Sequence, residues 1–132
     1  MMKLATIPNL VGGHLGGWRH KDAFDKPVMN LEAFIEMSQI AERGKLDAIF
    51  LADTPAITDR IDYRPFQSME PTIVLAMVAA CTNHIGLIAT ASTTYNEPYN
   101  IARRFATLDL ASGGRAGWNA VTSVRPSETC HN

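Results

Sequence analysis

Short apolar segments alternate with amphipathic segments along this chain, and no other feature of the sequence constrains its fold as strongly. Four segments have the composition of strands: residues 3–10, 46–53, 85–94 and 115–123. Three segments between them space their apolar residues as helices do: 31–43, 71–83 and 98–110. A strand–helix repeat of roughly thirty residues favours parallel strands joined by right-handed crossovers. The sequence therefore predicts an α/β fold.

The predicted helices carry signals at their ends. Asn30 is suited to cap the helix that begins at residue 31, and Gly44 is suited to the C′ position after its last turn. Pro71 suits the first turn of the second helix. We expect two inner faces: Leu31, Phe34, Ile35, Ile40 and Ala41 on the first helix, and Leu75, Val78 and Ala79 on the second.

Polar residues lie where each predicted strand ends. His14 is in the glycine-rich loop after the first strand, and Asp53 ends the second, a nearly unbroken apolar run that we expect to be buried on both faces. Thr90 begins a hydroxyl-rich stretch in the third strand, and Asn119 lies on the fourth. Ligands of parallel α/β folds bind at the carboxyl ends of the strands, so we expect these four groups to converge. No GxGxxG motif follows the first strand, which argues against a Rossmann dinucleotide site.

The composition argues against several classes of protein. A formal net charge of -1, with scattered basic residues, disfavours a nucleic-acid partner. Cys81 and Cys130 form no CxxC pair, and the histidine spacings match no zinc or haem motif. No apolar run is long enough for a membrane helix or a signal peptide. We therefore expect a reduced, cytoplasmic protein with one core and without a metal or a membrane contact.

Four sequence blocks, in order and over most of the chain, carry a more specific signal. They are GHLGGWRH at 13–20, AERGKLDAIFLAD at 41–53, TASTTYNEPY at 90–99, and ARRFATLD with GGRAGWNAVTS between 102 and 123. Together they resemble the nitrilotriacetate monooxygenase and long-chain alkane monooxygenase branch of the bacterial luciferase-like flavin monooxygenase superfamily.

The resemblance implies a TIM-like (β/α)8 barrel, of which this chain holds the N-terminal half, about four βα units. It implies a two-component monooxygenase that takes reduced FMN from a partner flavin reductase and uses O2 to oxidise a small organic substrate. It also implies that Asp53, Thr90 and Asn119 contact the flavin, and that His14 is a catalytic residue near flavin and substrate.

Pattern alone gives the same residues simpler interpretations. Asp53 also suits the capping of a loop or helix, and the threonines agree with the strand propensity of that residue. A lone histidine such as His14 in a glycine-rich loop is more often an ordinary exposed side chain. Arg103 and Arg104 are expected to be solvated or salt-bridged.

The resemblance changes at the C-terminal end. Residues 1–123 are predicted as a partial barrel and 124–132 as a tail that does not match the family, and Lys21 replaces a proline usual in the relatives. A complete barrel of this type takes roughly 250 residues, so we expect the chain alone not to turn over substrate. Two alternatives are an inactive half-barrel that self-associates into a homo-oligomer and a deazaflavin-dependent oxidoreductase. The polar loop 54–69 is expected to help cover the site.

Overall fold

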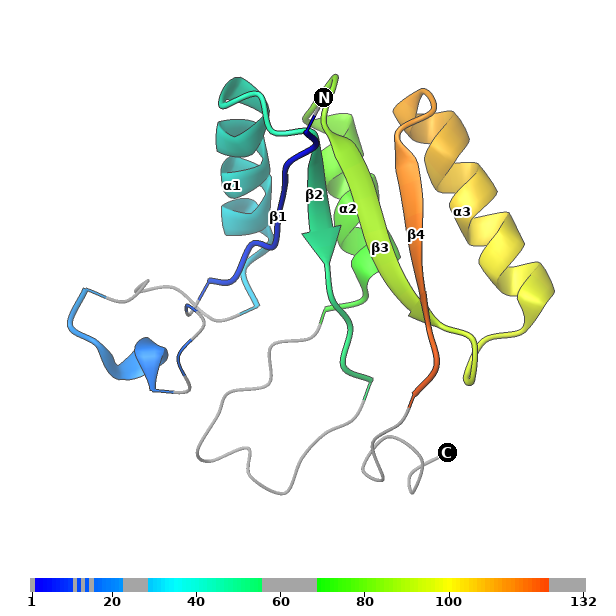
Figure 1. Ribbon diagram of the computed structural model, residues 1–132, viewed down its shortest axis with the longest axis horizontal. Coiled ribbons are helices and arrows are strands. Elements are labelled where there is room, and N and C mark those ends of the chain that lie inside the picture. The colour runs from blue at the N-terminus through cyan, green and yellow to red at the C-terminus, as the bar shows by residue number, and fades with distance from the viewer. Residues whose placement is uncertain are drawn as a thin grey trace.

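The computed structural model describes residues 2–10, 12, 14, 16–22, 29–55 and 69–123. In chain order its elements are β1 (Ala5–Thr6), the 3-10 helix η1 (Gly17–Arg19), α1 (Leu31–Arg43), β2 (Ala48–Leu51), α2 (Pro71–Ala80), β3 (Gly86–Ser92), α3 (Pro98–Ser112) and β4 (Ala116–Val121). The strands form one parallel sheet in the order β1-β2-β3-β4 (Figure 1). This confirms the predicted α/β fold, and the strand order is that of part of a TIM-like barrel. No helix within these ranges has both the length and the apolar character of a membrane span.

The strands begin and end inside their predicted ranges, and β1 departs furthest from the prediction. Only Ala5 and Thr6 pair with β2. Among the described residues β1 is an outer strand with a single partner, and Pro8 has no backbone N–H to extend the ladder. The residue before β1 is linked to the residue before β2: the Leu4 N–H donates to Asp47 Oδ2 over 2.8 Å, and the Leu4 carbonyl accepts from the Asp47 N–H over 2.8 Å.

The ends of α1 follow the capping signals with one shift. Asn30 Oδ1 accepts a hydrogen bond from a backbone N–H of the first turn over 3.1 Å, as predicted. At the other end Gly44 has a φ of -72°, and Lys45 takes the left-handed conformation with a φ of 60°. The Leu46 N–H donates to the Ala41 carbonyl over 3.1 Å, which closes a Schellman turn. The prediction of Gly44 at C′ was therefore wrong, because Gly44 is the C-cap and Lys45 is at C′.

The core lies between one face of the sheet and the three α-helices. Its buried members are Ala41, Ile49, Leu51, Val74, Leu75, Val78, Ala79, Ile85, Leu87, Ala89 and Leu108. They include the inner face predicted for α2, which is confirmed. On α1 the prediction for Ile40 was wrong, because this side chain is 51% exposed. Ser38 is buried instead, and its hydroxyl donates to the Phe34 carbonyl over 2.6 Å, so the polar group is satisfied within its own helix.

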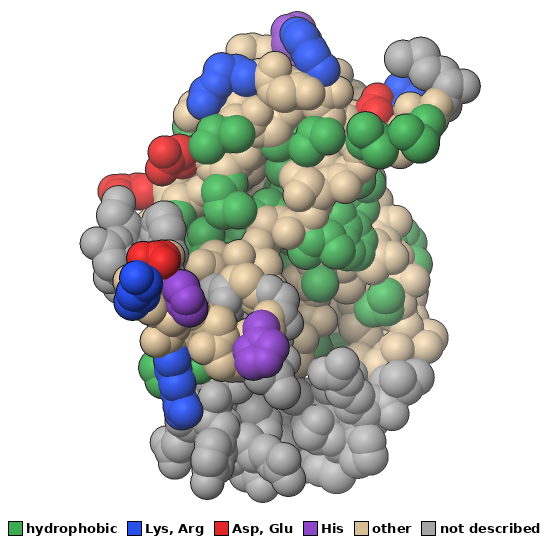
Figure 2. Space-filling view, turned by 60° about the vertical axis from the view of Figure 1, so that its left-hand side comes forward, with side chains coloured by type: hydrophobic (Ala, Val, Ile, Leu, Met, Phe, Trp, Pro, Cys, Tyr) green, Lys and Arg blue, Asp and Glu red, His purple; other side chains and the backbone are tan. Residues whose placement is uncertain are grey.

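The opposite face of the sheet has a mixed character. Phe50 and its β3 neighbour Ile88 lie on this face and are half-buried, because the described helices cover only the other face. The prediction that β2 is buried on both faces therefore holds for the helix-covered face alone. A Cβ at Gly117 would lie 3.1 Å from Ile88 Cγ1, so glycine allows β4 to approach β3 closely here. Figure 2 shows hydrophobic side chains at the surface on the side of the molecule that carries α1 and β1.

Two charged side chains anchor the sheet edge opposite the carboxyl ends of the strands. The Arg115 guanidinium donates to four carbonyls: that of Ser112 over 2.7 Å, and those of Ala79, Thr82 and Ile85 over 3.1, 3.0 and 2.9 Å. Glu42 Oε1 accepts from the three consecutive N–H groups of residues 83–85 over 2.9, 2.6 and 3.0 Å. Three N–H groups and two carbonyls of the segment between α2 and β3 are thereby bonded to two side chains from elsewhere in the chain.

Candidate functional site

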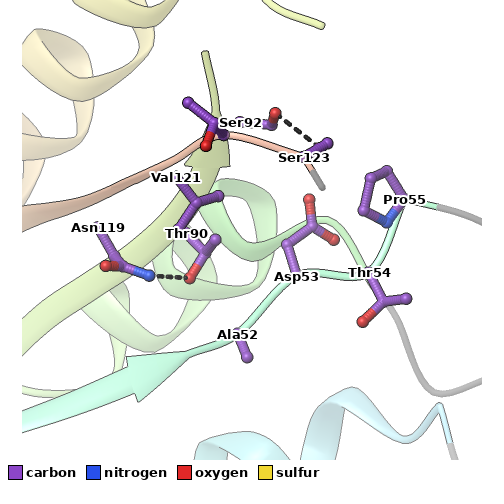
Figure 3. Close-up of a pocket in the computed structure, with 10 residues that line it drawn as sticks. Ala52, Asp53, Thr54, Pro55, Thr90, Ser92, Asn119, Val121 and Ser123 are labelled. Carbon is purple, nitrogen blue, oxygen red and sulfur yellow. Dashed lines mark hydrogen bonds between the residues drawn. The ribbon is translucent and has the colours of Figure 1, made fainter. Parts of the chain in front are cut away.

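An open cavity of about 230 Å³ lies at the carboxyl ends of β2, β3 and β4 (Figure 3). Its lining comprises Ala52, Asp53, Thr54, Pro55, Thr90, Ser92, Asn119, Val121, Thr122 and Ser123. These residues are distant in the sequence but meet because neighbouring parallel strands end at the same edge of the sheet. The cavity therefore combines a carboxylate, several hydroxyl groups and an amide with apolar side chains.

Thr90 and Asn119 form the polar centre of this lining. They are direct neighbours in the register of β3 and β4, so their side chains lie on the same face of the sheet. Asn119 Nδ2 donates to Thr90 Oγ1 over 3.0 Å. Thr90 is buried and Asn119 is half-buried. Because the Thr90 hydroxyl accepts this bond, its own hydrogen is the group it can donate to a ligand.

Asp53 brings the carboxylate to the cavity from the loop that follows β2. It lies two residues after the last residue of the strand and is half-buried. Figure 3 shows it on the cavity side of this loop, facing the end of β3 that carries Thr90. The prediction that the ends of β2, β3 and β4 converge on one site is thereby confirmed in its geometry.

A second set of hydroxyl groups ties the ends of β3 and β4 together. Ser92 Oγ and Ser123 Oγ lie 2.9 Å apart and share a hydrogen bond. The Thr94 N–H donates to Ser92 Oγ over 3.2 Å, and the Ser123 N–H donates to Thr94 Oγ1 over 3.2 Å. The side of the cavity formed by β3 and β4 is therefore cross-linked between the two strand ends.

Ser92 and Ser123 also line the cavity; both lie in the predicted polar strand ends, but neither was assigned a role from the sequence. The sequence signal for Ser92 is the period of two along a strand. This period places Ser92 on the same face as Thr90, and Val121 on the same face as Asn119. This alternation, applied to the predicted strand ends, would have identified Ser92 beside the residues that were named.

The predicted catalytic residue His14 does not line the cavity. Its side chain is exposed, and its Nδ1 accepts a hydrogen bond from the Gly16 N–H over 3.0 Å. The proton of the neutral imidazole is therefore on Nε2. The convergence expected for four strand-end groups is thus seen for three of them, and the role of His14 stays a prediction. Of the loop predicted to cover the site, residues 56–68 lie outside the described ranges.

Comparison with known proteins identifies relatives along almost the whole chain. A family model described as luciferase-like monooxygenase matches residues 9–132. The N-acetyl-S-(2-succino)cysteine monooxygenase of Bacillus subtilis strain 168 is 49% identical over 122 residues, which cover 92% of this chain and 28% of that protein. Nitrilotriacetate monooxygenase component A of Aminobacter aminovorans is 43% identical over 143 residues, which cover 99% of this chain and 31% of that protein.

The fold has relatives among solved structures. Riboflavin lyase, whose structure is described as containing modified FMN and the substrate riboflavin, superposes with a TM-score of 0.77 at 34% identity, over 92% of this chain and 30% of its own. The chain thus spans about a third of the length of these proteins. The family inferred from the four sequence blocks is confirmed: the chain belongs to the luciferase-like monooxygenase family.

Proposed function

We propose that this chain contributes to the cofactor site of a two-component monooxygenase that uses reduced FMN and O2 to oxidise a small organic substrate. The observation that carries the proposal is that Asp53, Thr90 and Asn119 line the same cavity at the carboxyl edge of the sheet. Family membership supports the reaction class, and the modified FMN in the related riboflavin lyase supports the cofactor. A flavin reductase is the proposed partner, since one relative is named as component A of its monooxygenase.

The side chains of the cavity fit a flavin ring. An isoalloxazine presents carbonyl and ring-nitrogen acceptors and an N–H donor, and such a ring needs a few placed polar groups in a largely apolar pocket. The Asp53 carboxylate can accept from an N–H group, and the Thr90 hydroxyl can donate to an acceptor. Ala52 and Val121 supply apolar lining beside them. Reduced FMN, when bound, supplies the electrons that activate O2.

The proposed tasks of the protein side chains are orientation and proton handling. Asp53, Thr90 and Asn119 orient the ring at the strand ends. His14 is proposed to hold a proton near the reacting atoms, because its Nδ1 accepts from the Gly16 N–H and the hydrogen of the neutral ring is then on Nε2. The loop of residues 54–69 is proposed to restrict the access of water.

A second candidate is a self-associating fragment without catalytic activity. It is favoured by the exposure of the apolar side chains that flank the outer strand β1: Leu4 is 47% exposed and Ile7 is 58% exposed. Outer strands with unpaired backbone groups readily pair with other chains. This candidate predicts a mass that rises with protein concentration in sedimentation, together with no saturable flavin binding.

Titration with FMN and reduced FMN tests the proposed function. We expect saturable quenching of flavin fluorescence by the unaltered chain, and a dissociation constant about tenfold higher in Asp53→Asn, because a hydrogen bond to a charged acceptor is lost. Glu36→Gln is the matched control, since it removes the same charge from the exposed face of α1. Absence of binding by the unaltered, folded chain, or equal binding by the two variants, would contradict the proposal.

A further inference from the structure

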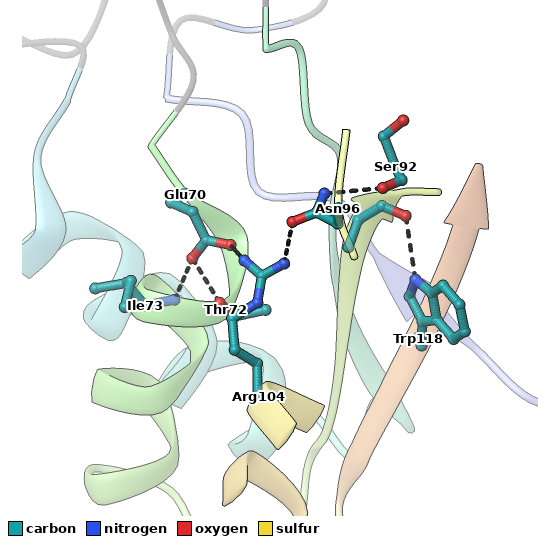
Figure 4. Close-up of polar contacts among 8 residues, drawn as sticks. Glu70, Thr72, Ile73, Ser92, Asn96, Arg104 and Trp118 are labelled. Carbon is teal, nitrogen blue, oxygen red and sulfur yellow. Dashed lines mark hydrogen bonds and ion pairs between the residues drawn. The ribbon is translucent and has the colours of Figure 1, made fainter. Parts of the chain in front are cut away.

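A chain of three side chains links α2, α3 and the end of β3 (Figure 4). Arg104 Nη1 pairs with Glu70 Oε1 at 3.2 Å, and Arg104 Nη2 donates to Asn96 Oδ1. Asn96 Nδ2 in turn donates to the Ser92 carbonyl over 2.8 Å. The expectation of a salt bridge for Arg104 is confirmed. Its guanidinium also binds the neutral side chain of Asn96, a contact that ion pairing does not explain.

We propose that Glu70, Arg104 and Asn96 form a clamp that positions the carboxyl end of β3 for the flavin. The inference rests on the proposed function, and it names residues that contact neither the cavity nor, in the proposal, the cofactor. Ser92 lines the cavity, and Thr90 lies two residues before it on the same face of β3. A clamp on the Ser92 carbonyl therefore sets the position of both hydroxyl groups.

The first end of the clamp is fixed by α2. Glu70 is the N-cap residue of this helix, and its Oε2 accepts from the Ile73 N–H over 2.7 Å and from the Thr72 hydroxyl over 2.6 Å. Its other oxygen, Oε1, is the one that meets Arg104. The carboxylate is therefore oriented by the first turn of the helix, and it presents one oxygen in a defined direction.

The middle of the clamp requires an arginine. The two terminal nitrogens of Arg104 bind different partners, and their planar fork fixes the distance between Glu70 and Asn96. Arg104 Nε is buried and has no hydrogen-bond partner in the described part of the chain, so the guanidinium is held from its two outer ends. A lysine keeps the charge but presents a single nitrogen, and it cannot reproduce both contacts in this geometry.

The far end of the clamp continues into the site. Ser92 Oγ bonds to Ser123 Oγ at 2.9 Å and accepts the Thr94 N–H over 3.2 Å. On the other side of the strand, Trp118 Nε1 donates to the Ala91 carbonyl over 3.1 Å. With the Asn96 amide on the Ser92 carbonyl, four contacts thus converge on two consecutive residues of β3, and the clamp supplies the one that reaches back to α2 and α3.

Amide hydrogen exchange of the purified chain tests the clamp without flavin. Arg104→Lys is compared with Arg103→Lys, a matched change at the exposed neighbouring position of α3. We expect the Thr94 amide to exchange about tenfold faster in Arg104→Lys, because the anchored end of β3 is released. The Leu87 amide, which donates to the Arg115 carbonyl over 2.8 Å, should keep its protection and thereby show that the fold is intact.

FMN titration of the same two variants tests the link to the site. We expect the dissociation constant to rise about threefold to tenfold in Arg104→Lys and to stay unchanged in Arg103→Lys. Equal Thr94 exchange in the two variants overturns the clamp, and faster exchange with unchanged FMN affinity overturns its role in flavin binding. Failure of the unaltered chain to bind FMN contradicts the proposed function, whereas the exchange comparison still decides whether the clamp holds β3.

Discussion

The hydrogen bond between Asn119 Nδ2 and Thr90 Oγ1 makes the two residues one unit, so their effects on a ligand should not be independent. Thr90→Val keeps the shape of the side chain and removes the hydroxyl, and Asn119→Leu removes the amide. We expect each change to raise the FMN dissociation constant about fivefold to tenfold, because each leaves a polar partner unsatisfied near the ligand. In the double variant the fold increase in the FMN dissociation constant should be smaller than the product of the two single fold increases, as measured by fluorescence titration.

The control for this cycle is Thr107→Val. Thr107 is exposed on α3, and the hydroxyl that this change removes donates to a carbonyl of the same helix. It should leave FMN affinity unchanged. Strictly multiplicative effects of Thr90→Val and Asn119→Leu would show that the bond between the two side chains does not contribute to the site.

At the scale of elements, the sequence predicted what depends on local pattern and failed where tertiary contacts decide. Helix α1 and its N-cap Asn30 follow from spacing and capping, whereas the pairing length of β1 depends on a neighbour that the local sequence does not specify. The meeting of Asp53, Thr90 and Asn119 in one cavity followed from their places at the carboxyl ends of parallel strands. The place of His14 did not, because a glycine-rich loop has no periodicity that fixes where its side chains lie.

Arg115 illustrates an element-scale anchor that the sequence pattern did not reveal, because three of the acceptors that its guanidinium reaches are backbone carbonyls from another part of the chain. It joins the residue before β4 to the end of α2 and to the loop before β3. We expect Arg115→Lys to lower the free energy of unfolding by about 2 kcal/mol, since a single ammonium cannot satisfy carbonyls in several directions. Urea denaturation measures this loss, and Arg43→Lys in the exposed last turn of α1 is the control.

For the molecule as a whole, two carboxylates couple stability to pH. Lys3 donates a hydrogen bond to Asp47, and with the Leu4 N–H it lowers the pKa of that carboxyl below its ordinary value of 3.8. Burial alone would raise the pKa of Glu42, but the three N–H groups of residues 83–85, with the charge of His84, outweigh it and lower that pKa below 4.5. Each carboxylate binds protons less readily in the folded chain than in the unfolded chain.

The sign of this coupling gives a direct prediction for acid unfolding. Groups with depressed pKa values stabilise the fold above their unfolded pKa values, and this contribution is lost as the pH falls through the lower folded values. We therefore expect the Tm to be nearly constant from pH 7 to about pH 5 and to fall below about pH 4.5, as each carboxylate is protonated.

Glu42→Gln should lower the Tm at pH 7 and flatten its fall in acid, because the substituted side chain no longer releases a proton on folding. Glu36→Gln, at an exposed position of the same helix, should keep the full fall of the Tm with decreasing pH. An unchanged slope in Glu42→Gln would mean that the three N–H contacts do not couple this carboxylate to folding, and that the acid sensitivity arises elsewhere in the molecule.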